Sequence, residues 1–91
     1  MMSDVRDNTE QDRYELEQDG MIAFADYRRS GNSVRISHVE APIPLRGTGA
    51  ADRLMRGITD IARRDGLTIF PLCSYAAAWM RRHKEVQDLL G

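Results

Sequence analysis

The feature that most constrains the fold is a change of hydrophobic period near residue 42. Before it come three short strand-like runs. Apolar and polar residues alternate over 13–18 and 33–40, as in half-buried strands, and the run over 21–29 is apolar on both faces near its middle. After it, apolar side chains recur every three or four residues over residues 51–62, which predicts an amphipathic helix. Pro42 and Pro44 mark the change, because proline cannot donate to a β-ladder.

Turn signals separate the strand runs and define the topology. Asp19-Gly20 is a pair typical of two-residue hairpins, and residues 30–32 form a second turn signal. A fourth strand over 67–73 follows the helix, and Ser74 can cap a second helix. Short turns predict an antiparallel meander, while the helical connection predicts parallel pairing of the third and fourth strands. The predicted fold is α+β, β-β-β-α-β-α, with helices packed on a curved, mostly antiparallel sheet.

Length and composition limit the function classes. The 91 residues leave room for one domain, which we expect over residues 12–91 after a flexible tail over residues 1–11. A net charge of −1 gives no global field to recruit nucleic acid or a membrane. The lone cysteine, Cys73, excludes a disulfide framework and a multi-cysteine zinc site, and no other metal site is indicated. With no secretory signal or membrane helix apparent, we expect a cytoplasmic protein; no pattern defines an oligomeric state.

The loop before the predicted helix has the chemistry of an anion site. Its sequence is Arg46-Gly47-Thr48-Gly49-Ala50-Ala51. Glycine leaves the backbone open, the first helix amides have no partner, and the helix dipole favours negative charge. The spacing fits neither the dinucleotide fingerprint nor a Walker loop. A plain glycine-rich turn explains the same residues.

Two side chains could carry chemistry. Cys73 ends the fourth strand directly before a helix, where a thiolate is stabilised, although an inert buried thiol is the alternative. His38 falls on the same face as Val34 and Ile36 by strict alternation, and is either a base or a packed structural residue. Trp79 and Tyr75 are expected in the core.

Two motifs together carry a family resemblance. The first is the loop over residues 46–51, an Arg, two residues, Gly, one residue, and then Gly or Ala. The second is Pro71-Leu72-Cys73-Ser74-Tyr75 followed by Arg81-Arg82-His83. Over residues 13–90 the chain resembles the small, single-domain GCN5-related N-acetyltransferases, and more narrowly their YjdJ-type subgroup. Val39 and Lys84 depart from that subgroup, which often has Thr and Pro at these positions.

The resemblance implies an acetyl-CoA-dependent N-acetyltransferase with an amine acceptor. It implies that the coenzyme A pyrophosphate lies on the loop amides and that the pantetheine arm lies between the splayed third and fourth strands. The implied cofactor-binding residues are Val39, Ala41, Arg46, Gly47, Thr48, Gly49, Ala50, Ala51 and Ser74. Cys73 is implied as a nucleophile or thioester neighbour, and His38 as a base. Larger members have helices between the first two strands, so here the acceptor side should be open or completed by a partner.

Two mechanisms and two other functions stay open. The acceptor amine attacks acetyl-CoA directly after His38 or a water removes its proton, or Cys73 takes the acetyl group first. The alternative functions are a CoA- or acyl-CoA-binding module without significant turnover, and a small structural or partner-binding domain. The acceptor itself, a protein lysine, an N-terminus, a polyamine or another small amine, is not defined by the sequence.

Overall fold

A single five-stranded sheet forms the framework of the protein. The structure, a computed structural model, describes residues 4–91. The strands follow chain order: β1 (Val5–Asn8), β2 (Arg13–Gln18), β3 (Met21–Ser30), β4 (Ser33–Glu40) and β5 (Thr68–Pro71). The first four pair antiparallel, and β4 pairs parallel with β5. The mixed α+β sheet predicted from the sequence is therefore confirmed.

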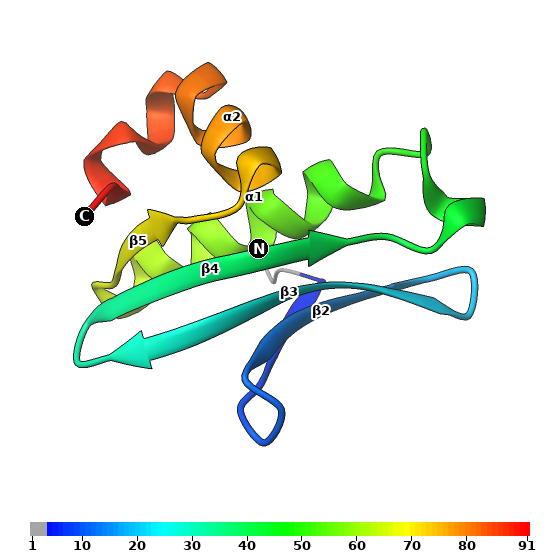
Figure 1. Ribbon diagram of the computed structural model, residues 1–91, viewed down its shortest axis with the longest axis horizontal. Coiled ribbons are helices and arrows are strands. Elements are labelled where there is room, and N and C mark those ends of the chain that lie inside the picture. The colour runs from blue at the N-terminus through cyan, green and yellow to red at the C-terminus, as the bar shows by residue number, and fades with distance from the viewer. Residues whose placement is uncertain (1–3) are drawn as a thin grey trace.

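Two helices cover one face of this sheet (Figure 1). The helical segments are η1 (Ile43–Leu45), α1 (Ala50–Asp65), α2 (Ser74–Arg82) and η2 (Lys84–Leu89). α1 packs on β2 and β3, while α2 packs on β4 and β5. Their apolar faces and the inward strand residues form one core, in which Leu16, Ile36, Leu54 and Trp79 are fully buried. No helix in the described part of the chain is long and apolar enough to cross a membrane.

β1 lies within the segment for which the sequence predicts a flexible tail. Residues 5–8 of that segment pair with β2, and Val5 is buried opposite Leu16. The observed order therefore has one strand more than predicted, β-β-β-β-α-β-α. A run with a single apolar residue carries no alternation signal, because its strand conformation depends on the neighbouring strand. Residues 1–3 of the predicted tail lie outside the described residues.

A β-bulge in β4 changes which side chains face the core. The register between β3 and β4 shifts between Asp26 and Tyr27, which leaves Ser37 as an extra residue. Beyond the bulge Val39 packs against the core and His38 is exposed. The prediction that His38 shares a face with the buried residues before it is therefore wrong, because strict alternation takes no account of the bulge.

Candidate functional site

β4 and β5 separate before β4 ends. Their register ends where Ile36 lies opposite Pro71. At this point the Ile36 carbonyl accepts hydrogen bonds from the amides of Leu72 (2.8 Å) and Cys73 (3.2 Å). β4 then continues to Glu40 with β3 on one side only, while the chain after β5 turns into α2 (Figure 1). The strand pairing therefore opens between the end of β4 and the start of α2, and past Ile36 this side of β4 has no strand partner among the described residues.

Val39 presents its backbone to this opening. In an antiparallel pair, residues alternate between bonding across to the partner strand and pointing away from it. Ile36 points away from β3, because its carbonyl bonds to the chain of β5. The extra residue at Ser37 makes Val39 the next residue with that direction. The Val39 N–H and C=O therefore face the space beyond the end of β5, as an edge that can pair with an extended ligand.

The start of α1 leaves several amides open. Gly49 is the N-cap residue, with a left-handed φ of 88° and no side-chain capping bond. The first helical hydrogen bond runs from the Arg53 amide to the Gly49 carbonyl (2.9 Å), so the amides of residues 50–52 have no partner within the helix. Gly47 also has a positive φ, and beyond chain neighbours no atom lies within 4 Å of the Cβ that either glycine would carry. The positive end of the helix dipole therefore meets open space, which suits an anion.

Side-chain hydrogen bonds hold this loop in place. The Thr48 hydroxyl donates to the Leu45 carbonyl (2.5 Å) and accepts from the Gln18 amide nitrogen of β2 (3.1 Å). Arg46 Nε donates to the Ala41 carbonyl (3.2 Å). Within the described part of the chain, the other guanidinium N–H groups of exposed Arg46 have no acceptor. These hydrogen bonds hold the loop in shape. The remaining N–H groups of the Arg46 guanidinium stay free to bind a ligand.

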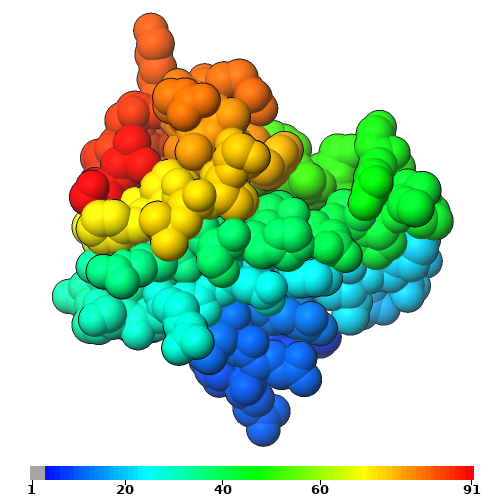
Figure 2. All heavy atoms as spheres, viewed as in Figure 1, coloured from blue at the N-terminus to red at the C-terminus, as the bar shows by residue number. Residues whose placement is uncertain are grey.

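A cavity of about 270 Å³ lies against the start of α1, in the hollow between the loop and α2 (Figure 2). Its lining residues are Ala41, Leu45, Arg46, Gly47, Gly49, Ala50, Ala51, Asp52 and Tyr75. Six of the nine predicted cofactor residues line it, whereas Val39, Thr48 and Ser74 do not. Tyr75, which was expected in the core, is 36% exposed and lines the opposite wall. The volume suits part of a large ligand whose remainder lies along the open surface.

Cys73 stands where β4 and β5 part. It is the N-cap residue of α2, and its Sγ accepts from the Ala76 amide at 3.4 Å. Its own amide bonds to Ile36, and the thiol is half-buried. The prediction that Ser74 caps α2 is therefore wrong, because the helix already begins at Ser74.

His38 lies on the face of the sheet opposite the helices. Its side chain is 54% exposed, and Nε2 lies 2.9 Å from a carboxylate oxygen of Glu40. The imidazole ring also lies 6.2 Å from the Phe24 ring, measured between centroids. Within the described residues no contact joins His38 to Cys73, so the structure does not assemble a Cys–His pair. It also places no three His, Cys, Asp or Glu residues of the described chain where they could hold a metal ion.

Comparisons with known proteins identify the family and support the fold. A family model described as GCN5-related N-acetyl-transferase matches residues 13–89. The chain belongs to this family. The solution structure of a GCN5-like protein from Staphylococcus aureus is similar, with a TM-score of 0.68 and 22% identity over 99% of this chain and 91% of that one. At that identity the likeness supports the fold alone. No curated protein matches the chain.

In this N-acetyltransferase-family domain, the sequence did not predict a set of hydrogen bonds at Asp52, one of which joins α1 to α2. Trp79 Nε1 donates to Asp52 Oδ1 (2.8 Å), and Arg56 Nε donates to Asp52 Oδ2 (2.9 Å). The hydrogen bond from Trp79, with that from Arg56, holds the pKa of the Asp52 carboxyl below its usual value. Trp79 is buried as predicted, but its N–H partner lies 27 residues away, so no local signal in the sequence indicates the pair.

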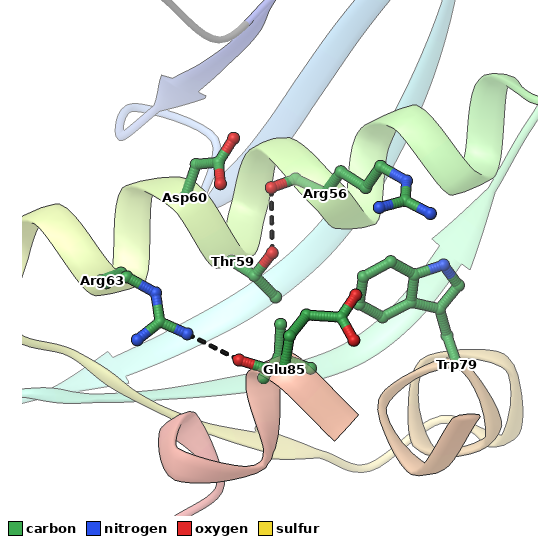
Figure 3. Close-up of a pocket in the computed structure, with 7 residues that line it drawn as sticks. Arg56, Thr59, Asp60, Arg63, Trp79 and Glu85 are labelled. Atoms are coloured by element: carbon green, nitrogen blue, oxygen red, sulfur yellow. Dashed lines mark hydrogen bonds between the residues drawn. The ribbon is translucent and has the colours of Figure 1, made fainter. Parts of the chain in front are cut away.

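A second hollow of about 420 Å³ lies between α1, α2 and η2 (Figure 3). It is lined by Arg56, Thr59, Asp60, Arg63, Trp79, Glu85 and Val86. Its two arginines are already paired, Arg56 with Asp52 and Arg63 with Asp88. Arg63 also donates to the Glu85 carbonyl (2.9 Å). None of the predicted site residues lines this hollow.

Proposed function

We propose that this chain is an acetyl-CoA-dependent N-acetyltransferase that acts on an amine. The observation that carries the proposal is a free strand edge at Val39 that leads, two residues on at Ala41, to the cavity at the open start of α1. Acetyl-CoA needs both, because its pantetheine arm is an extended chain of amides and its pyrophosphate is an anion. Family membership supplies the reaction class.

Each part of acetyl-CoA is assigned to its own group of residues. The pyrophosphate lies on the amides of residues 49–51 and beside the Arg46 guanidinium, with Gly47 giving close approach. Thr48 keeps the loop in shape through its hydroxyl. The pantetheine amides pair with the backbone of Val39 and, past it, with Ala41. The thioester then lies at the narrow end of the opening, beside Cys73 and Ser74.

The reaction we favour is direct transfer. A neutral acceptor amine attacks the thioester carbonyl carbon, a C–N bond forms, the C–S bond breaks, and coenzyme A leaves as a thiolate that takes up a proton. A water or His38 accepts the proton that the amine loses. His38 faces the open side of the sheet, from which an acceptor can approach, and Glu40 orients its ring.

The competing route passes through Cys73. Its thiolate attacks the same carbonyl carbon, an acetyl-cysteine forms as coenzyme A leaves, and the amine then takes the acetyl group. Intact mass after incubation with acetyl-CoA separates the routes. One added acetyl group on Cys73 supports this route, whereas an unmodified protein that still acetylates an amine supports direct transfer.

Calorimetric titration with acetyl-CoA tests the proposal. We expect saturable binding, and no heat at high micromolar acetyl-CoA would contradict the site. A second assay follows coenzyme A release with a polyamine or a lysine peptide as acceptor. Binding without release across a broad amine panel would favour the alternative function, a CoA- or acyl-CoA-binding module.

A further inference from the structure

We propose that Asp52 and Trp79 are positioning residues that set the width of the cofactor cavity. The inference rests on the proposed function, because it assigns a role to residues beside the assigned acetyl-CoA site. Asp52 and its neighbours in the first turn of α1 line one wall of the cavity, and Tyr75 of α2 lines the other. The Trp79–Asp52 hydrogen bond joins the two helices that carry these walls.

The Trp79–Asp52 hydrogen bond acts on the cavity through Asp52 and Tyr75, which line it. Trp79 follows Tyr75 by four residues on α2, so the two side chains project from the same side of the helix. Trp79 is 1% exposed, so its N–H would lose a partner in a water-poor site if the bond to Asp52 broke. Moving α2 away from the first turn of α1 would therefore strain this bond.

Further contacts fix the indole in place. The His83 ring stacks on Trp79 with centroids 3.8 Å apart, and His83 Nδ1 donates to the Trp79 carbonyl (2.6 Å). The Arg56 guanidinium lies 5.9 Å from the indole centroid, and Figure 3 shows it directed toward Trp79. This gives His83, the last residue of the second sequence motif, a structural role at the site.

Asp52 has two effects that can be tested separately: its negative charge acts on a bound phosphate, and its oxygen accepts the hydrogen bond from Trp79. A carboxylate in the first turn of α1 disfavours a phosphate at the same helix start, so removing its charge alone should strengthen anion binding. Removing the hydrogen-bond acceptor should instead loosen the cavity and weaken binding. Asp52→Asn removes the charge and keeps an oxygen acceptor, whereas Asp52→Ala removes both.

The test compares acetyl-CoA affinity by calorimetry in Asp52→Asn, Asp52→Ala, Trp79→Phe and the control Asp60→Ala. Asp60 is an exposed acidic residue of the same helix that lies outside the cofactor cavity. We expect Asp52→Asn to bind at least as tightly as the wild type and Asp60→Ala to bind equally. Asp52→Ala should bind about five- to tenfold more weakly than Asp52→Asn, which has lost the same charge, and Trp79→Phe about five- to tenfold more weakly than the wild type, as expected for one lost hydrogen bond.

The comparison of Asp52→Asn with Asp52→Ala decides the outcome. Only the positioning role predicts that asparagine keeps the acetyl-CoA affinity that alanine loses. If Asp52→Ala binds as tightly as Asp52→Asn, or if both weaken equally, the positioning role is refuted while the proposed function stands. The two Asp52 variants are enough for this conclusion even if Trp79→Phe does not fold. If the wild-type protein itself does not bind acetyl-CoA, the proposed function and this inference fail together.

Discussion

Substituting Gly49 by alanine separates backbone strain from ligand binding. Gly49 has a φ of 88°, and a left-handed conformation costs a residue with a Cβ about 1–2 kcal/mol. No atom beyond its chain neighbours lies within 4 Å of the new methyl group, so no internal clash adds to this cost. In a domain of this size each kcal/mol lowers Tm by about 4–8 °C. The same methyl group would stand beside the assigned phosphate, and losing one charge-assisted hydrogen bond weakens binding about 10- to 150-fold.

Gly66→Ala is the matched control for this substitution. Gly66 ends α1 with a φ of 69° and equally open surroundings, about 24 Å from Gly49 along the 16-residue helix. Thermal unfolding should show a lower Tm for both variants, whereas calorimetry below both transitions should show weaker acetyl-CoA binding for Gly49→Ala alone. Equal acetyl-CoA affinity of the two variants would refute the assignment of the loop.

Three further predictions concern single side chains. Glu15→Gln should lower Tm, because Glu15 is buried; hydrogen bonds, chiefly from Arg13, hold its pKa below the usual value. Because the folded-state pKa is lowered, this stability is present above the unfolded pKa of about 4.3 and is lost as pH falls below it, so the Tm difference should shrink at acid pH; a constant difference would contradict this. Cys73→Ser keeps a cap for the Ala76 amide and should retain coenzyme A release under direct transfer, whereas complete loss would favour the cysteine route. His38→Ala should leave Tm nearly unchanged, since the side chain is exposed, and should lower kcat without changing KM for acetyl-CoA; unchanged kcat would exclude His38 as the base.

Local signals were enough to predict the helix and the loop. The apolar stripe of α1 and the glycines at both of its ends, Gly49 and Gly66, act within one or two turns of chain. The open amides likewise follow from the residues at the helix start alone. These features could be predicted from the sequence because no distant contact is needed to define them.

Features that depend on distant partners could not be predicted. β1 is a strand because it pairs with β2, and the exposure of His38 follows from a bulge defined by β3. The Asp52–Trp79 bond depends on how two helices cross, which residue spacing within either helix does not define. These three features therefore depend on pairing and packing between segments that are distant in the sequence.

Amide chemical-shift mapping tests the central claim most directly. The isotope-labelled protein is titrated with acetyl-CoA, and each backbone amide is followed by NMR. We predict that the largest shifts occur at Gly47, Gly49, Ala50 and Ala51, with a second group at Val39 on the open edge of β4. Shifts confined to the hollow between α1, α2 and η2, with the loop and Val39 unchanged, would contradict the account.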